Sequence, residues 1–359
     1  MSFDVHKIRA EFPILTREIH GKPLAYLDNA ASAQKPIAVL DAMRTCFEHS
    51  YANVHRGLHT MANETTENFE AARRTIAEFL GAAEANEIIF TKGATEALNL
   101  VAYGLMGEIG EGDEIILTKM EHHSNIVPWN FLRERLGAVI KWVPVLEDGT
   151  LDLDAYIALF TPRTKVVSVV HMSNVTGTIN PVKDMAKTAH DHNCLFVVDG
   201  TQAAVHMPVD VLDIDADFYA MTGHKLYGPT GIGALYGKRE CLETLRPFQG
   251  GGEMIEDVFL DKITYADIPH KFEAGTPPIM EAIGFDAAIK WVTALDRSAV
   301  EAHEMMLYQR ALDGLSEINA FRLIGNAPRK GAVLSFGLEG AHAHDIAQIL
   351  DRYGIAIRA

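Results

Sequence analysis

The chain has 359 residues, of which 48% are hydrophobic and 22% are charged. This is an ordinary globular composition, and it excludes collagen-like, coiled-coil and disordered classes. The 32 basic and 48 acidic side chains give a formal net charge of −16, which argues against non-specific binding to nucleic acid or to an anionic membrane. The length is sufficient for two domains, one large and one small.

The cysteines and the N-terminus indicate the cellular compartment. Cys46, Cys194 and Cys241 show no CxxC spacing, so neither a disulfide framework nor a Cys-rich metal site is expected. A reducing, cytoplasmic location is the simplest interpretation. The N-terminus has no basic segment followed by an apolar core, so no secretory signal is predicted. No apolar run approaches the length of about 18 residues that a membrane span needs.

Short β-branched runs alternate with helical patterns through the middle of the chain. The runs predicted as strands are 87–91, 114–118, 139–143, 166–170, 194–198, 217–221 and 232–236. The segments predicted as helices are 66–80, 94–105, 126–136 and 181–192. Strands separated by helices indicate βαβ units and a mostly parallel, doubly wound sheet. The ligand of such a sheet lies beyond the carboxyl ends of its strands.

Beyond about residue 240 this alternation stops. The elements predicted there are loops at 249–252 and 272–278, a long helix over 278–295, and strands at 332–336 and 354–358. We therefore expect a large domain over residues 21–265 and a smaller α+β domain over 266–359. An N-terminal segment, 1–20, is expected to pack with the smaller domain.

A glycine turn after the first of these strands leads directly into a helix. Gly93 allows a ligand to approach the backbone closely, and the amides of Ala94 and Thr95 open the helix. Together with the Thr95 hydroxyl, they predict a phosphate site. The alternative is an ordinary helix N-cap by Thr91 or Thr95.

Two charged residues follow later strands. Asp199 ends a buried strand and needs a partner, because an unpaired buried charge is costly. It could be a helix N-cap, a metal ligand or the partner of a protonated ring nitrogen. Lys225 lies between a strand end and a Gly-rich turn, where burial would lower its pKa and make it a nucleophile. The alternative is an ordinary solvated lysine.

Histidines occur near two further segment ends. His122 and His123 follow the strand at 114–118, and one of the two rings is expected to face the ligand. His342, His344 and Asp345 are interpreted as the start of a helix with exposed histidines rather than as a metal site. The phosphate turn, Asp199 and Lys225 together suggest pyridoxal 5′-phosphate (PLP), which needs a phosphate cup, a carboxylate and an amine.

These residues belong to a longer set of motifs with a specific resemblance. The motifs are 24–36 (LAYLDNAASAQKP), 54–57 (VHRG), 120–123 (MEHH), 169–175 (VVHMSNV), 198–202 (VDGTQ), 223–231 (GHKLYGPTG) and 272–277 (FEAGTP). The chain resembles the class V aminotransferase-like, fold-type I PLP enzymes, and within them the SufS/CsdA type of cysteine desulfurase. The resemblance implies an α/β fold with a mostly parallel seven-stranded sheet in the large domain.

The resemblance also implies a role for individual residues. Lys225 binds the PLP aldehyde and acts as the base, Asp199 pairs with the ring nitrogen, and His122 stacks on the ring and takes part in catalysis. Gln202 is implied to contact the ring oxygen, and Thr95, Thr222, His224 and (from a second subunit) Thr276 are implied to hold the phosphate. Asn174 is implied to bind the cofactor on its substrate side. The residues implied to line the substrate side are His55, Arg56 and Arg358. Thr222 stands where many relatives carry Ser, and Ala94 where many carry a second Thr.

The implied activity is the conversion of L-cysteine to L-alanine, with sulfur passed to an acceptor for Fe–S cluster assembly. The resemblance further implies a homodimer and a SufE- or SufU-like acceptor protein. Selenocysteine lyase activity on L-selenocysteine is an alternative on the same scaffold.

One part of the family pattern lies beyond the printed sequence. The resemblance implies a nucleophilic cysteine in a Gly/His loop after the strand at 354–358, followed by a substrate-binding Arg and the last helices, whereas the sequence stops at Ala359. None of the three cysteines has the exposed, electropositive setting that a reactive thiol needs. Either the sequence is a truncated cysteine desulfurase, or the protein binds PLP without desulfurating, as a pseudo-enzyme in sulfur transfer. A truncated small domain would expose apolar surface and reduce solubility.

Overall fold

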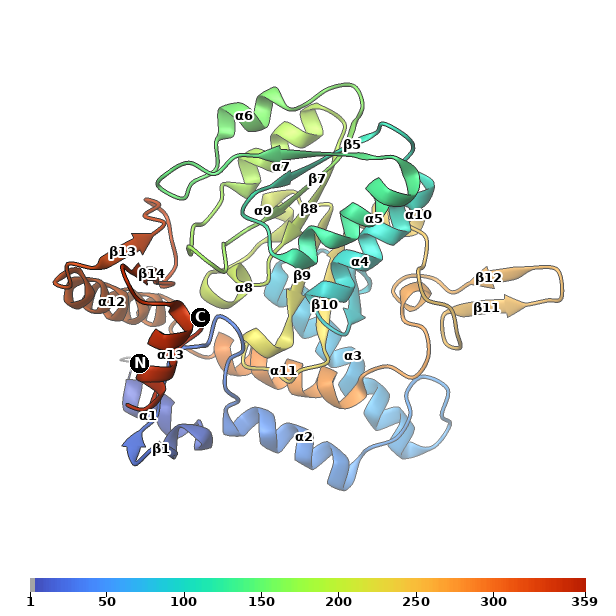
Figure 1. Ribbon diagram of the computed structural model, residues 1–359. Helices are drawn as coiled ribbons and strands as arrows, with labels where there is room; N and C mark the ends of the chain where they lie inside the picture. Colours follow the sequence, from blue (N-terminus) through green and yellow to red (C-terminus); the bar gives the residue numbers. More distant parts are fainter. Residues whose placement is uncertain (1–3) are drawn as a thin grey trace.

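The structure, a computed structural model, describes residues 4–359 and is built around one central sheet (Figure 1). The sheet has seven strands in the order β4-β10-β9-β8-β7-β5-β6. The strands are β4 (Ile88–Thr91), β5 (Glu114–Thr118), β6 (Val139–Val143), β7 (Thr164–Val170), β8 (Leu195–Asp199), β9 (Phe218–Thr222) and β10 (Gly233–Gly237). Only β10 is antiparallel to its neighbours in this sheet. The predicted mostly parallel, seven-stranded α/β fold is confirmed.

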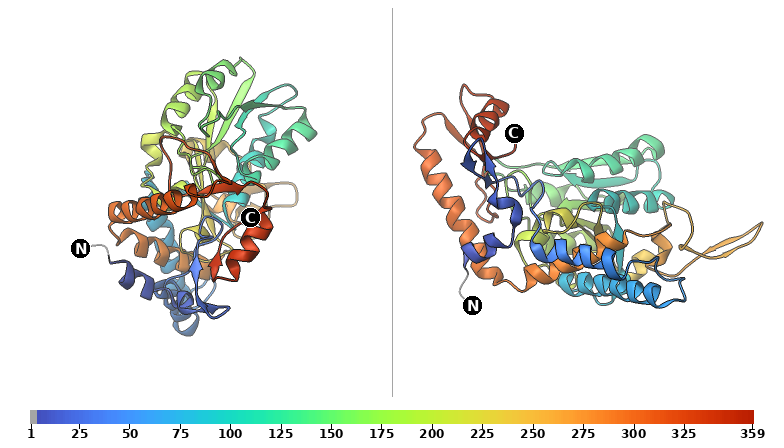
Figure 2. Two further views of the ribbon diagram at one scale, coloured as in Figure 1. Left: turned by 60° about the vertical axis from the view of Figure 1, so that its left-hand side comes forward. Right: turned by 90° about the horizontal axis from the view of Figure 1, so that it is seen from below.

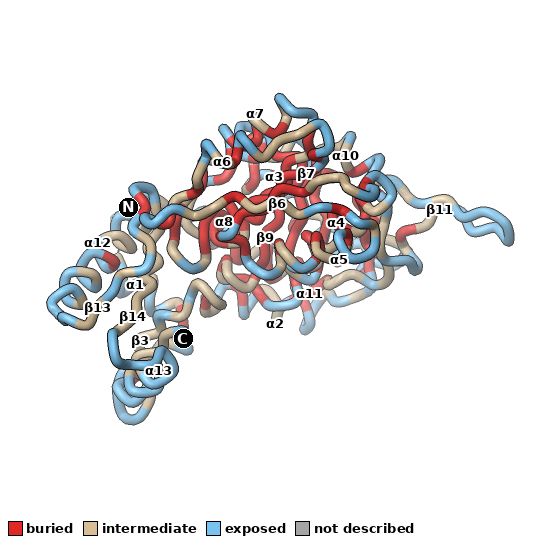
Figure 3. The backbone as a smooth tube through the Cα atoms, turned by 45° about the horizontal axis from the view of Figure 1, so that its top comes forward, coloured by how far each residue is buried: buried red, intermediate tan, exposed pale blue. Residues whose placement is uncertain are grey.

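Helices cover both faces of the sheet. Ile88 and Phe90 of β4 pack into one buried core, whereas Ile89 packs into the other. The helices on the first face include α3 (Thr60–Leu80), α7 (Val182–Asp191) and α11 (Ile279–Thr293), and those on the second include α4 (Ala94–Gly104) and α5 (Val127–Leu136). Burial on both faces explains the nearly continuous apolar runs of the strands. Figure 3 shows the buried residues concentrated in this central layer.

The helix ends follow local capping chemistry. α3 begins at Thr60, earlier than the predicted residue 66, because the ring of His59 accepts a hydrogen bond from Ala62 N at 3.2 Å. The same helix ends at Gly81, whose φ of 69° is the left-handed conformation that favours glycine. The predicted helices at 94–105, 126–136, 181–192 and 278–295 are confirmed to within a few residues.

A smaller group of elements follows α11, at the left of Figure 1. It consists of α12 (Arg297–Ser316), β13 (Phe321–Ile324), β14 (Ser335–Leu338), α13 (Ala343–Asp351) and β15 (Ile355–Ala356). β15 pairs in parallel with β3 (Ala25–Tyr26), which confirms the strand expected near 354–358. The strand predicted at 332–336 was placed too early. Gly331 N donates a hydrogen bond to Gly177 O at 2.9 Å, so this segment pairs with the loop around Gly177 before β14 begins.

The N-terminal segment contacts both parts of the molecule. Phe12 packs edge-on against Trp291 of α11 with ring centroids 5.3 Å apart, and His20 pairs with Asp351 of α13 at 3.0 Å. The segment begins with α1 (Val5–Ala10), and residues 1–3 lie outside the described part of the chain. α11 itself lies against α3 and α2 (Ile37–His49). The domain division at 265/266 stays a prediction.

A two-stranded hairpin projects from the opposite end of the molecule. It is formed by β11 (Ile255–Val258) and β12 (Ile263–Tyr265), and Figure 2 shows it extending away from the body. The remaining short elements are β1 (Glu18–Ile19), β2 (Lys22–Pro23), α6 (Leu153–Ala158), α8 (Ala203–His206), α9 (Val211–Ile214) and α10 (Arg239–Thr244). Among residues 4–359, no helix combines the length and apolarity needed to cross a membrane.

Candidate active site

The carboxyl ends of three strands meet at one edge of the sheet. β8 and β9 are parallel, and β4 and β9 are both antiparallel to β10, so that β4 runs in the same direction as β9. The residues that follow β4, β8 and β9 therefore share this edge. It is the edge at which ligands of open α/β sheets bind.

The turn after β4 has the features of an anion site. Gly93 has a φ of 151°, and a Cβ placed on it would meet only the Thr222 hydroxyl, at 3.4 Å. α4 begins at the next residue with no side-chain cap, so the predicted alternative of a threonine N-cap is wrong. The first turn of α4 thus has no side-chain cap and begins beside the Thr222 hydroxyl, an arrangement suited to a phosphate.

Asp199 ends β8 and is 3% exposed. Its Oδ1 accepts a hydrogen bond from Thr201 N at 3.0 Å. The next helix, α8, has Gln202 as its N-cap residue, so Asp199 is not a helix cap. Asp199 is also absent from the one His/Asp/Glu group within residues 4–359 that has metal-like spacing. Pairing of Asp199 with a protonated ring nitrogen stays a prediction.

Lys225 lies in the tight turn at Gly223–Lys225 that follows β9. Burial lowers the pKa of its ammonium group, the charge of Asp199 opposes that effect, and the charge of Arg358 adds to it. The structure thus brings Lys225 and Asp199 into the same electrostatic environment. A partly desolvated amine of this kind is more nucleophilic at neutral pH than an exposed lysine. Lys225 is partly buried, and its role as a nucleophile stays a prediction.

His122 lies on the same edge and is connected to the phosphate turn. Its Nδ1 accepts a hydrogen bond from Ser124 N at 3.2 Å and lies 3.0 Å from Ser124 Oγ. Ser124 Oγ in turn lies 2.7 Å from the Thr95 hydroxyl. Because a backbone amide can only donate, Nδ1 is the unprotonated nitrogen of the neutral ring. Burial lowers the pKa of His122, which favours this neutral form.

The segment before α2 closes the site from another side. Gln202 donates to Ala30 O at 2.7 Å, and His224 Nδ1 lies 3.3 Å from Ser32 Oγ. Lys35, which sequence reasoning missed, donates to His224 O at 3.2 Å. Burial lowers the pKa of Lys35 to about 8. Its position within the 24–36 motif was the available signal, but its burial depends on contacts with a distant turn.

Asn174 lies in the turn after β7. The neighbouring Ser173 hydroxyl accepts hydrogen bonds from Val175 N and Thr176 N at 3.2 and 3.1 Å, and these bonds order the turn. Asn174 itself is partly buried. It follows the strand adjacent to β8, so it comes from the same sheet edge as Asp199.

Three further candidate residues, Arg358, Arg56 and His55, form ion pairs or hydrogen bonds with other side chains, and Thr276 is exposed. Arg358 forms a two-point ion pair with Asp28, with both N···O distances 2.9 Å. Arg56 pairs with Glu253 at 3.2 Å. Among residues 4–359, no contact joins His55, Arg56 or Thr276 to Lys225, so their proximity to the site stays a prediction.

His55 belongs to a buried network around Arg73. His55 Nε2 lies 3.0 Å from Glu70 Oε1, and its ring packs edge-on against His270 with centroids 4.8 Å apart. These three side chains have metal-like spacing, but Arg73 binds both oxygens of Glu70 at 2.9 and 3.2 Å. Burial opposes ionisation, yet the hydrogen bonds from His55 and Arg73 lower the pKa of Glu70 to about 2. The guanidinium already supplies the cation of this group.

The histidines near the C-terminus form a helix start, as predicted. His342 is the N-cap of α13, and its ring accepts a hydrogen bond from His344 N at 3.2 Å. Asp345 lies in the first turn, and both histidines are exposed.

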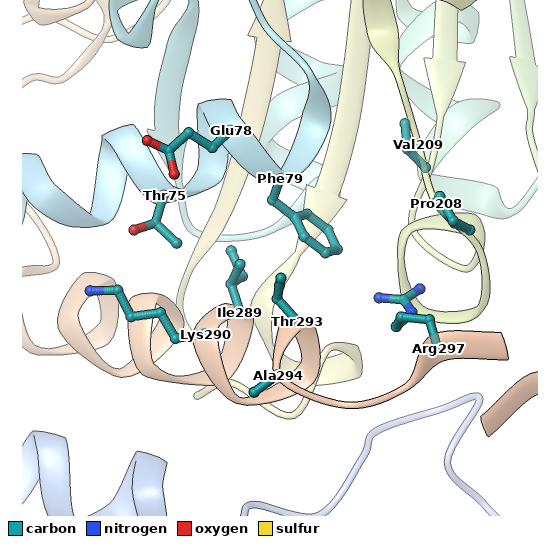
Figure 4. A pocket seen from close by; sticks show the side chains of 10 residues that line it. All are labelled: Thr75, Glu78, Phe79, Pro208, Val209, Ile289, Lys290, Thr293, Ala294 and Arg297. Atoms are coloured by element: carbon teal, nitrogen blue, oxygen red, sulfur yellow. The ribbon is translucent and has the colours of Figure 1, made fainter. Parts of the chain in front are cut away.

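A cavity of about 570 Å³ lies away from these residues (Figure 4). Its lining comes from α3, the 208–209 segment, the C-terminal part of α11 and the first residue of α12, and includes Phe79, Ile289 and Arg297. None of the candidate site residues lines it. The sheet edge therefore remains the candidate active site.

The residues at this edge fit PLP. Gly93 leaves open the space that a phosphate would occupy beside Thr222, Lys225 offers an amine with a lowered pKa, and Asp199 offers a buried carboxylate. His122 connects with the phosphate turn through Ser124. The fold and the site together are those of a fold-type I PLP enzyme, the class that the sequence motifs indicated.

Comparison with known proteins gives the same class. The family model "Aminotransferase class-V" matches residues 25–359, and the chain belongs to this family, whose cofactor is PLP. Within this family, highly similar curated proteins are cysteine desulfurases, and the chain belongs to this group. The cysteine desulfurase of Pectobacterium atrosepticum is 48% identical over 361 residues, covering 100% of this chain and 88% of the relative. A probable cysteine desulfurase of Streptomyces coelicolor is 49% identical over 364 residues, covering 99% and 87%.

Solved structures agree with the sequence relatives. The cysteine desulfurase CsdA of Escherichia coli, in an S-sulfonic acid form, superposes with a TM-score of 0.92 at 39% identity. The apo cysteine desulfurase of Thermococcus onnurineus NA1 gives 0.94 at 38% identity. Both comparisons cover 100% of this chain and 88% of the other.

Proposed function

We propose that the protein is a PLP-dependent cysteine desulfurase that converts L-cysteine to L-alanine and transfers the sulfur to a thiol. The observation that carries the proposal is the convergence of Lys225, Asp199 and the Gly93 turn at one sheet edge. Membership of the cysteine desulfurases supports the choice of substrate.

Bound PLP supplies an aldehyde that reacts with amines and a protonated ring that withdraws electrons from the substrate α-carbon. Asp199 is proposed to hold the proton on the ring nitrogen, because a buried carboxylate favours a cationic partner. Lys225 Nζ is proposed to take the α-proton of L-cysteine, since burial lowers its pKa and increases the neutral fraction. His122 is proposed to lie on the ring face, and Gln202 beside the ring oxygen.

The remaining candidate residues are assigned by their position around this centre. Thr95, Thr222 and His224 are proposed to hold the phosphate with the amides of α4. Asn174 and Arg358 are proposed to lie on the substrate side. Arg358 is held by Asp28, so it would have to exchange this partner to bind a substrate carboxylate.

The sulfur transfer requires a thiolate. It attacks the sulfur of L-cysteine, the carbon–sulfur bond breaks, a persulfide forms, and the carbon takes up a proton to give L-alanine. Cys46 and Cys194 are 4% and 3% exposed, and burial raises the pKa of Cys194 to about 11 and that of Cys241 to about 12. We therefore infer that the attacking thiolate is none of these three cysteines. The proposed final acceptor is a SufE- or SufU-like protein that serves Fe–S cluster assembly.

We further propose that the enzyme is a cytoplasmic homodimer. The three cysteines are free, as is usual in a reducing compartment. The tip of the β11–β12 hairpin exposes Val258, Phe259 and Leu260 by 59%, 58% and 109%. An apolar patch of this kind on a projecting arm marks a protein interface. A second copy is the proposed partner, and Thr276, His55 and Arg56 are proposed to complete the site of that copy.

The test is alanine formation from L-cysteine by the 359-residue protein with added PLP and an exogenous thiol. We expect alanine well above the level of a Lys225→Ala control. Bound PLP is followed separately by its visible absorption. A protein that binds PLP but makes no more alanine than the Lys225→Ala variant would contradict the proposed activity of this chain.

A further inference from the structure

A buried carboxyl group lies directly behind the turn that carries His122. Glu121 is 8% exposed and accepts three hydrogen bonds. Thr118 Oγ1 and Asn125 Nδ2 each donate over 2.6 Å, and Val170 N donates over 2.9 Å. The donors come from the end of β5, the segment before α5 and the end of β7. One carboxyl group therefore fastens three segments together at the edge where the site lies.

The orientation of Asn125 is fixed by its other contacts. Its Oδ1 accepts hydrogen bonds from Trp129 Nε1 at 3.0 Å and from Ser168 Oγ at 2.6 Å. The indole can only donate, so the amide oxygen must face Trp129 and the amide nitrogen must face Glu121. Asn125 and Ser168 are fully buried, so water cannot relieve a mismatched pair.

The same network reaches the strand end that holds Asp199. Val170, which donates to Glu121, is followed by His171, and His171 N donates to Asp199 O at 2.9 Å. Burial raises the pKa of Glu121 to about 8, and the charge of Asp199 adds to the increase. Glu121 thus connects the turn that carries His122 with the strand end that carries Asp199.

We propose that Glu121 is a positioning residue that fixes the position of His122 relative to Asp199. The two side chains would then hold the PLP ring in one orientation. The inference rests on the proposed function, which places His122 on the ring face and Asp199 at the ring nitrogen. Glu121 is proposed to act through the backbone of the 121–125 turn.

The first test is Glu121→Gln. Both oxygens of a carboxyl group can accept a hydrogen bond whether or not the group is protonated, but an amide nitrogen cannot. The glutamine amide nitrogen would face Asn125 Nδ2, which would lose its acceptor, so the turn must shift. We expect the visible absorption band of bound PLP to shift and the Kd for PLP to rise. With L-cysteine, kcat should fall about tenfold while KM changes little, as a displaced catalytic group predicts.

The matched control is Asp217→Asn. Asp217 is also buried, at 5% exposure, but it lies just before β9, at the far end of that strand from Thr222, where it accepts from Phe196 N at 2.7 Å. We expect it to lower thermal stability while leaving the PLP band and Kd unchanged. Thr118→Val removes one donor and keeps the carboxyl group, so it should give a smaller shift in the same direction. It serves as the test variant if Glu121→Gln does not fold.

The decisive variant is the exchange Glu121→Gln/Asn125→Asp. The glutamine amide can then donate to the new carboxylate, which still accepts from Trp129 and Ser168, and the PLP band and Kd should return toward wild type. The proposal is overturned if Glu121→Gln keeps the wild-type band and Kd, if Asp217→Asn shifts them equally, or if the folded exchange variant does not recover. These readouts require PLP binding alone, so a wild-type protein that binds PLP without forming alanine would contradict only the proposed function.

Discussion

Gly93 shows how one missing side chain shapes the site. Its φ of 151° is rarely adopted by other residues, and a Cβ there would point at Thr222 Oγ1. Gly93→Ala would add backbone strain of about 1–3 kcal/mol and fill space meant for a ligand. We expect a PLP Kd at least about tenfold higher, measured by titration of the apo-protein.

Gly314→Ala is the control for this substitution. Gly314 lies in α12, and a Cβ there would meet nothing within 4 Å. Alanine in a helix is favoured over glycine by about 0.5–1 kcal/mol, so this variant should be slightly more stable and bind PLP normally. Equal PLP affinity in both variants would show that the Gly93 turn does not contact the cofactor.

Glu121 also makes stability depend on pH. Burial raises its pKa from 4.5 to about 8. Between these values the folded state keeps a proton that the unfolded state has released, so the stabilisation is complete below pH 4.5 and is lost as the pH rises through about 8. We expect the decline in Tm from pH 5 to pH 8.5 to be shallower in Glu121→Gln than in wild type. Thermal unfolding at constant ionic strength measures both slopes, and identical slopes would contradict the assignment.

At the scale of elements, Arg73 joins α3 to the loop before α11. Its side chain is 1% exposed and binds both oxygens of Glu273, at 2.6 and 2.9 Å, as well as Glu70. Arg73→Leu would leave the buried Glu273 and the partly buried Glu70 without their cation, so we expect a loss of about 3–5 kcal/mol in urea unfolding. Arg74→Leu, next to it, removes only an exposed pair with Glu67 and should change stability by less than about 1 kcal/mol. A small effect in both variants would contradict this account.

The elements that sequence alone predicted well are those whose burial is periodic. β5 and β6 match their predicted bounds, because strands covered on both faces are continuous apolar runs between turn residues. The predicted start of β14 was wrong, because the residues before it contact another loop: Gly331 N donates a hydrogen bond to Gly177 O. Such a pairing between distant loops leaves no local pattern.

The site also contains residues that could be predicted from sequence and residues that could not. Lys225 and Asp199 could be predicted because strand ends and Gly-rich turns are visible in the sequence. Glu121 and Arg73 could not, because an acidic or basic residue usually indicates solvent exposure. Their partners Val170 and Glu273 are distant in the chain, and only the folded sheet brings them together.

At the scale of the whole molecule, the β11–β12 hairpin projects away from the body (Figure 2). Leu260, at its tip, is fully exposed, and we expect Leu260→Asp to convert a dimer to a monomer in light scattering after size exclusion. Ile157→Asp is the control, because Ile157 is 54% exposed on α6, away from the hairpin. Dimers of equal stability in both variants would show that the hairpin tip is not the interface.

The position of β10 has a consequence for biosynthesis. This strand lies between β4 and β9, and a Cβ on its first residue, Gly233, would lie 2.6 Å from Gly93 Cα. The two halves of the phosphate cradle are therefore fixed only after a late segment of the chain has inserted beside an early one, which is a slow type of contact to form. We therefore expect a nascent chain to lack the complete phosphate cradle until β10 has left the ribosome. PLP then stabilises the finished sheet by mass action, so the supply of PLP when β10 inserts, and not earlier in translation, should govern how much folded enzyme survives.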